Sequence, residues 1–77
     1  MDTAISVGLR VMRIVMEESG VKQLGEATTF EELGMDSLDF VSMIQAIEKE
    51  FGPIPKSHLI GIENVGNLID VVEAMEC

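Results

Sequence analysis

The sequence predicts a small all-α protein, a bundle of three main helices with a short helix between the last two. Apolar residues make up 47% of the 77 residues and are mainly aliphatic or Met, with no Trp or Tyr. Leu and Met favour helices, and the aromatic and Thr-rich composition typical of strands is missing. Three segments repeat apolar residues at helical spacing. A chain of this length holds one core, so we expect residues 1–77 to form a single domain.

The first predicted helix covers residues 3–19. Its apolar stripe is Ile5, Leu9, Met12, Val15 and Met16, widened by Val7, Val11 and Ile14. Asp2 or Thr3 is placed to cap its start, and Gly20 to end it in a left-handed conformation. Gly8 lies inside this helix, where it costs about 1 kcal/mol relative to Ala, so we expect a close packing contact there.

Residues 21–35 form a long connection. Loops of this length in compact domains are usually functional or packed onto the core. Thr29 and Glu32 have the spacing of a capping box, which predicts a short turn that Phe30 and Leu33 pin to the core.

The second main helix is predicted for residues 37–51. Asp36 is its expected N-cap, and Asp39 lies three residues later, where an acid gives a variant of the capping box. Gly52-Pro53 ends the helix. The expected buried stripe is Leu38, Val41, Ile44, Ile47 and Phe51.

The remaining helices follow a linker that Pro53 and Pro55 hold extended. Residues 57–60 are predicted to form one helical turn, ended by Gly61. Asn64 is the expected cap of the last helix. The apolar stripe of this helix is Val65, Leu68, Ile69, Val72 and Met75.

The charge restricts the partners. Fourteen acidic and five basic residues give a net charge of −9. This argues against nucleic acid and anionic membrane surfaces, which bind basic faces, and it favours a partner with a basic patch. No segment has the length of a membrane span, and no signal-peptide pattern begins the chain, so we expect a cytoplasmic monomer. The single cysteine, Cys77, has no internal disulfide partner and is expected to be an exposed thiol.

Ser37 is the strongest candidate for a chemically functional residue. It is predicted at the first position of a helix, after a long loop and between two carboxylates. A helix N-terminus offers unpaired N–H groups and partial positive charge, which suit a phosphate ester. On local spacing alone, the plain alternative is that Asp36 and Ser37 only begin a helix.

Catalytic and metal-binding roles fit this segment poorly. A serine nucleophile needs a base and a group that orients the base, but His58 is the only histidine and the G-x-S-x-G pattern is absent. Asp36 and Asp39 lack the spacing of a calcium loop. We therefore predict no catalytic residues and no dedicated metal site.

Residues 30–39, Phe-Glu-Glu-Leu-Gly-Met-Asp-Ser-Leu-Asp, resemble the modification site of acyl carrier proteins, where an F-x-x-L-G-x-D-S-L stretch opens the second helix. Residues 47–51, 54–55 and 62–65 extend the resemblance over nearly the whole chain. It implies the acyl carrier protein fold and a carrier that is not itself an enzyme. It also implies that a phosphopantetheinyl transferase attaches 4′-phosphopantetheine to Ser37, whose terminal thiol then holds acyl groups as thioesters.

The resemblance also implies roles for other residues. Those expected to meet basic patches on the transferase and on acyl-transfer and chain-elongating enzymes are Asp36, Leu38, Asp39 and Glu48. Those expected to part and shelter an acyl chain are Val41, Ile44, Ile60, Ile62 and Leu68.

Some residues depart from the pattern of fatty-acid carriers. Ser42 stands where an acid is common, and Lys56-Ser57-His58 replaces an acidic third segment. Within fatty-acid, lipid or polyketide-like metabolism, we therefore expect a dedicated carrier of a specialised pathway. The alternatives are a peptidyl or aryl carrier and an unmodified acidic helical adaptor. Asp36 before the serine favours acyl cargo.

Overall fold

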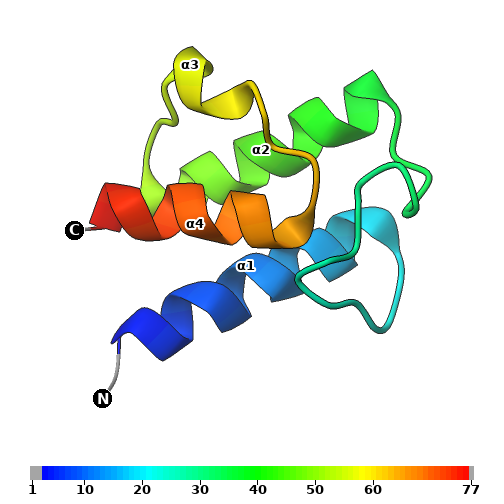
Figure 1. The fold of residues 1–77 in the computed structure, drawn as a ribbon, viewed down its shortest axis with the longest axis horizontal. Coiled ribbons are helices and arrows are strands. Elements are labelled where there is room, and N and C mark those ends of the chain that lie inside the picture. Colours follow the sequence, from blue (N-terminus) through cyan, green and yellow to red (C-terminus); the bar gives the residue numbers. More distant parts are fainter. Residues whose placement is uncertain (1–2, 77) are drawn as a thin grey trace.

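The computed structural model describes residues 3–76, with side chains described for residues 7–75. This part of the chain contains the helices α1 (Thr3–Ser19), α2 (Ser37–Phe51), α3 (Lys56–Leu59) and α4 (Val65–Glu76). The predicted all-α bundle of three main helices and one short helix is confirmed (Figure 1). The expected cap at Asp2 or Thr3 and the thiol of Cys77 fall outside the described side chains.

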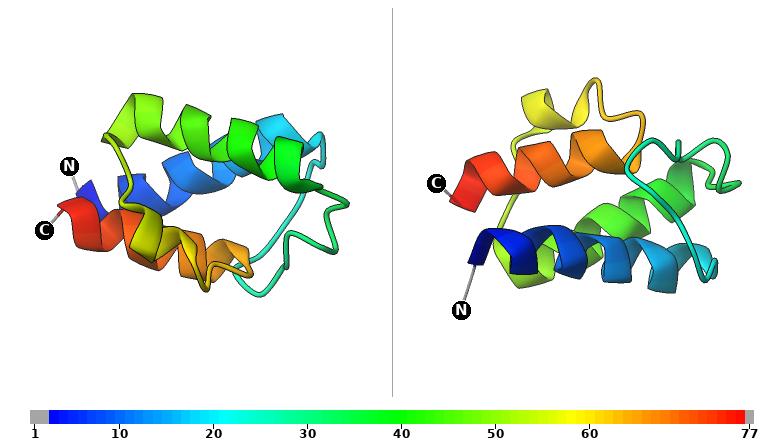
Figure 2. Two further views of the ribbon diagram at one scale, coloured as in Figure 1. Left: turned by 90° about the horizontal axis from the view of Figure 1, so that it is seen from above. Right: turned by 60° about the horizontal axis from the view of Figure 1, so that its bottom comes forward.

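The arrangement brings three segments of the chain together at one end of the bundle. α1 packs against both α2 and α4. The short α3 lies on the far side of the bundle from α1 (Figures 1 and 2). The long loop after α1, the start of α2 and the start of α4 all lie at the end opposite the two chain termini. Within the described residues, no helix combines the length and the apolar character needed to cross a bilayer.

The core is aliphatic apart from one Phe and one Met, and it contains no buried polar side chain among the described residues. Three main helices, the long loop and the α2–α3 linker contribute to it. Its members are Val7, Val11, Ile14, Val15, Phe30, Met43, Ile44, Ile47, Ile54, Val65, Leu68, Ile69 and Val72.

The buried side of α1 differs from the predicted stripe. Val7 and Val11, expected only to widen it, are fully buried, whereas Leu9 is 63% exposed. Leu9 is two residues from each of them, which turns its side chain about 200° away on a helix. The prediction for Leu9 is therefore wrong, because α2 and α4 together cover the valine side.

The buried side of α2 differs in a similar way. Met43, Ile44 and Ile47 are buried, but Leu38 is 77% exposed and Val41 is 50% exposed. Leu38 lies in the first helical turn, and no element among the described residues covers it there. The predicted stripe is therefore wrong at its N-terminal half, and two apolar side chains remain on the surface near Ser37.

The α2–α3 connection follows the prediction closely. Gly52 has a φ of 106° and ends α2, donating its N–H to the Glu48 carbonyl at 2.8 Å. α3 begins at Lys56, one residue earlier than expected, because the helical conformation follows directly after Pro55. The His58 N–H donates to the Pro55 carbonyl at 2.9 Å.

The tight backbone approach lies in α4, not in α1. A Cβ added at Gly8 would meet only the Ile69 Cγ2 atom, at 4.0 Å, so the close contact predicted there is wrong. A Cβ at Gly66 would lie 3.1 Å from the Glu26 carbonyl oxygen. That same oxygen accepts the Gly66 N–H at 2.8 Å, which holds the long loop against α4.

Candidate functional site

Ser37 is exposed and is the first residue of α2, as predicted. Asp36 caps the helix: its backbone is extended, and its Oδ1 accepts the Asp39 N–H at 2.9 Å. The Asp36 carbonyl accepts the Phe40 N–H at 2.9 Å. These two bonds fix the direction in which α2 leaves the loop, and therefore fix the position of Ser37.

The loop before Ser37 is a closed turn. The predicted capping box is present: the Thr29 N–H donates to Glu32 Oε1 at 2.9 Å, and the Glu32 N–H donates to Thr29 Oγ1 at 3.0 Å. Gly34 has a φ of 74°, a conformation that side chains disfavour, and its N–H donates to the Glu31 carbonyl at 3.0 Å. The turn therefore delivers the chain to Asp36 along a defined path.

Phe30 ties this turn to the rest of the bundle. Its side chain is buried, and its N–H donates to the Glu63 carbonyl at 3.1 Å. Its ring meets the ring of Phe40 edge to face, with centroids 5.4 Å apart and planes at 70°. Phe40 lies three residues after Ser37, on the same side of α2. The aromatic pair thus joins the loop to the first turn of α2 beneath the serine.

The starts of α2 and α4 differ in how their N–H groups are used. In α4 the first four N–H groups are all bonded: Val65 to the Thr28 carbonyl, Gly66 to the Glu26 carbonyl, and Asn67 and Leu68 to Asn64. In α2 the N–H groups of Ser37 and Leu38 have no acceptor within the described part of the chain. Such groups favour an anion, so the start of α2, and not that of α4, suits a phosphate ester.

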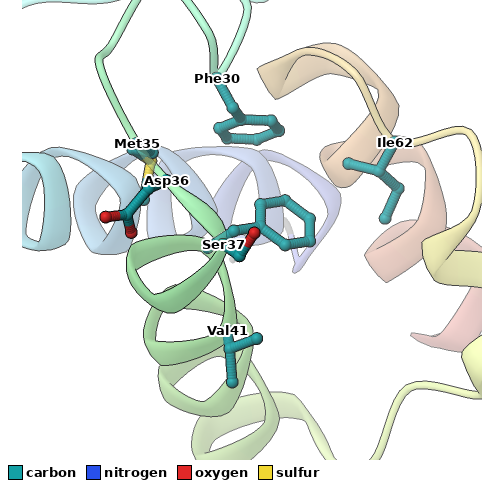
Figure 3. A pocket seen from close by; sticks show the side chains of 7 residues that line it. Phe30, Met35, Asp36, Ser37, Val41 and Ile62 are labelled. Carbon is teal, nitrogen blue, oxygen red and sulfur yellow. The ribbon is translucent and has the colours of Figure 1, made fainter.

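Ser37 stands at the edge of an open hollow of about 350 Å³, which we call the serine hollow. Figure 3 shows the Ser37 hydroxyl on the side of the hollow and the Asp36 carboxylate pointing to the other side of the helix start. A phosphate on Ser37 would therefore not face that carboxylate directly. The hollow is lined by Phe30, Met35, Asp36, Ser37, Phe40, Val41 and Ile62.

A second hollow of about 270 Å³ lies next to it between α2, the α2–α3 linker and α3; we call it the linker hollow. It is lined by Phe40, Val41, Ile44, Gln45, Glu48, Ile54, Lys56 and Leu59. Phe40 and Val41 line both hollows. We refer to the two hollows together as the trough; the serine hollow lies beside Ser37, and the linker hollow reaches α3.

Three of the five residues predicted to shelter an acyl chain line this trough. Ile62 lines the serine hollow, Ile44 the linker hollow, and Val41 both. Ile60 is 84% exposed and Leu68 is fully buried in the core, and neither lines the serine hollow or the linker hollow. The lining residues of the serine hollow that the sequence did not assign to the site are Phe30, Met35 and Phe40. Phe40 was detectable, because a position three residues after Ser37 shares its side of the helix.

The residues predicted for partner recognition fall into two groups. Asp36, Leu38 and Asp39 are exposed around Ser37. Glu48 is partly buried about three turns beyond Ser37 along α2, and its Oε2 accepts the Ile54 N–H at 2.8 Å. Its carboxylate is therefore engaged within the chain. His58 is exposed on α3 and lines neither hollow.

The geometry fits a covalently held phosphate ester: an exposed hydroxyl, two free helix N–H groups and an adjoining apolar trough. Within the described residues, no group of three His, Cys, Asp or Glu side chains is placed to hold a metal ion. The family model for the phosphopantetheine attachment site matches residues 10–72, most of the chain. The chain therefore belongs to this family of carrier domains, such as acyl carrier protein, which bear a covalently attached 4′-phosphopantetheine.

Proposed function

We propose that this protein is an acyl carrier protein whose Ser37 bears the 4′-phosphopantetheine, and that residues 1–77 form a single carrier domain. The observation that carries the proposal is the position of Ser37: it is exposed, begins α2, and borders the serine hollow. The free N–H groups at the same helix start would stabilise the phosphate. When bound, the arm supplies a thiol that holds acyl groups as thioesters.

The attachment reaction requires only an accessible hydroxyl from this chain. The Ser37 Oγ forms a phosphoester bond to the pantetheine-side phosphorus of coenzyme A, the pyrophosphate bond breaks, and adenosine bisphosphate leaves. The hydroxyl proton passes to a base on a separate magnesium-dependent phosphopantetheinyl transferase. We assign the base to the transferase because the Asp36 carboxylate, the acid that lines the serine hollow, points away from the Ser37 hydroxyl (Figure 3). In this proposal the protein is a substrate and a shuttle, not an enzyme.

The charges around Ser37 support a role for Asp36 and Asp39 in attracting partners. Both carboxylates are exposed, and they belong to a chain with a net charge of −9. A transferase or a chain-elongating enzyme with a basic patch would be steered to the start of α2, and salt would weaken the encounter. Leu38, exposed between them, offers an apolar contact to the same partners.

The trough supports acyl cargo. Val41, Ile44 and Ile62 present apolar surface to the hollows, and burial of a cargo methylene against such surface yields about 0.8 kcal/mol. The roles proposed for Ile60 and Leu68 require α3 to move relative to α4, because neither residue lines the serine hollow or the linker hollow in this conformation. Lys56 and His58 on α3 favour a dedicated partner set over a general fatty-acid synthase.

Intact mass measurement tests the attachment. The protein is incubated with coenzyme A, magnesium and a broad-specificity phosphopantetheinyl transferase. We expect the wild type to gain one phosphopantetheine and Ser37→Ala to gain none. Ser42→Ala is the matched control, since Ser42 is another exposed serine of α2 and should leave the gain intact. A folded, unmodified wild type that gains no mass would instead support the unmodified acidic adaptor.

A further inference from the structure

We propose that Asn67 is a positioning residue for the attachment of phosphopantetheine: from the first turn of α4, its side chain holds in place the loop that presents Ser37 to the transferase. The inference rests on the proposed attachment at Ser37. Asn67 lines neither the serine hollow nor the linker hollow, so it acts through a series of backbone hydrogen bonds.

The Asn67 side chain organises the chain just before α4. Its Oδ1 accepts two consecutive backbone N–H groups, that of Glu63 at 3.0 Å and that of Asn64 at 3.3 Å. Its own backbone N–H donates to the Asn64 Oδ1 at 2.8 Å, and this bond by itself caps the helix. The two bonds that the Asn67 side chain accepts instead fix the backbone of residues 63–64, which precede α4.

This backbone directs one carbonyl at the loop. The Glu63 carbonyl and the Asn64 N–H belong to the same planar trans peptide, so they point in opposite directions. The bond from the Asn64 N–H to Asn67 therefore sets the direction of the Glu63 carbonyl. On the other side of that peptide, the carbonyl accepts the Phe30 N–H at 3.1 Å.

Phe30 carries the constraint towards Ser37. Its carbonyl accepts the Met35 N–H at 3.2 Å, which closes the turn two residues before Ser37. Residues 26–30 run antiparallel to residues 63–66, and three backbone hydrogen bonds join the two segments. Figure 2 shows the long loop beside the start of α4. The hydrogen-bonded connection from Ser37 to α4 therefore runs through this pairing.

Loss of the Asn67 acceptor should loosen the loop without unfolding the bundle. Glu63 is exposed, so water can bond to its N–H, but water does not fix the direction of the Glu63 carbonyl. The segment around Ser37 would then spend part of its time in arrangements that the transferase does not bind. The KM for the carrier rises by the inverse of the competent fraction, whereas kcat, which belongs to the bound carrier, is unchanged.

Transferase kinetics with the full chain test this role. Asn67→Ala and the larger Asn67→Leu both lack the acceptor. In both we expect a KM for the carrier about fivefold above the wild type, which corresponds to a competent fraction of about one fifth, and an unchanged kcat. Asn67→Asp keeps the acceptor and should keep the wild-type KM. Amide hydrogen exchange of the unmodified carrier should be faster at Phe30 in the Ala and Leu variants only.

Ile69→Val is the matched control for a loss of stability alone. Ile69 is also in α4, but it is buried and faces Gly8 of α1 instead of the loop. This variant should lower the melting temperature and leave both the KM and the Phe30 exchange rate unchanged. The inference is overturned if Ile69→Val raises the KM as much as Asn67→Ala does, or if Asn67→Asp behaves like Asn67→Ala.

The same measurements separate this inference from the proposed function. If intact mass shows that the wild type gains no phosphopantetheine, the attachment is refuted, and the role of Asn67 in it is refuted too. If the arm is attached but the KM is the same with and without an acceptor at residue 67, the attachment stands and only the positioning role is refuted.

Discussion

The side chain of Glu48 closes the turn that links α2 to α3. Its Oε2 accepts the Ile54 N–H at 2.8 Å, and its own backbone carbonyl accepts the Gly52 N–H at 2.8 Å. One residue thus holds both ends of the segment where the chain leaves α2. Ile54 is buried, and the Glu48 carboxylate is the acceptor that its N–H finds.

Glu48→Ala should therefore lower stability. The Ile54 N–H loses its acceptor, which costs about 1–2 kcal/mol for a partly buried group bonded to a carboxylate. Glu48→Gln keeps an acceptor oxygen and should lose less than half of that. Urea denaturation of the two variants measures the difference. If Glu48 served only to contact partners, both variants would unfold at the wild-type urea concentration.

Asp36 combines a structural role with a proposed recognition role, and two substitutions separate them. Asp36→Ala removes the N-cap of α2 and should lower the free energy of unfolding by about 1 kcal/mol. Asp36→Asn retains a capping oxygen and should cost little stability, but it removes the charge. Both variants should reduce kcat/KM of the transferase. If Asp36→Asn lost as much stability as Asp36→Ala, the capping role of Asp36 would be contradicted.

The two helical glycines of α1 and α4 should respond in opposite directions to Ala. Gly8→Ala gains helix propensity of about 0.5–1 kcal/mol, because the new Cβ would meet only Ile69 at 4.0 Å. Gly66→Ala gains the same propensity but places a Cβ 3.1 Å from the Glu26 carbonyl oxygen. We expect a net loss of about 1 kcal/mol at Gly66, since that carbonyl is also its hydrogen-bond acceptor. Thermal denaturation of the two variants measures these changes in stability. Equal gains in stability at both sites would mean that the loop containing Glu26 moves away from the new Cβ at little cost.

Added salt should stabilise the fold. With a net charge of −9, we expect repulsion among carboxylates to outweigh the attraction in the described ion pairs, those of Arg10 and Arg13 with Glu50. Raising the salt from low to physiological ionic strength screens this repulsion and should raise the melting temperature by about 5 °C. Calorimetry at a series of sodium chloride concentrations measures this change in melting temperature. An unchanged or falling melting temperature would show that the Arg–Glu50 pairs dominate.

Local signals in the sequence predicted the boundaries of α1 and α2 and the place of Ser37. Asp36 bonds to the N–H three residues away, and Thr29 and Glu32 exchange bonds across the same short distance. Gly34 and Gly52 adopt the positive φ values that their positions required. Each of these interactions is complete within a few residues, so the sequence pattern alone specifies it.

The sequence by itself therefore determined the helices, the exposed serine at a helix start and the family of carrier domains to which the chain belongs. Only the tertiary structure decided which side of α1 is buried, that Glu48 bonds to the linker, and that Phe30, Phe40 and Ile62 meet around one hollow. The physical reason is the distance along the chain over which each interaction acts. Caps and turns act between neighbours along the chain, whereas a hollow exists only where side chains from the loop, α2 and the segment before α4 are brought together by packing.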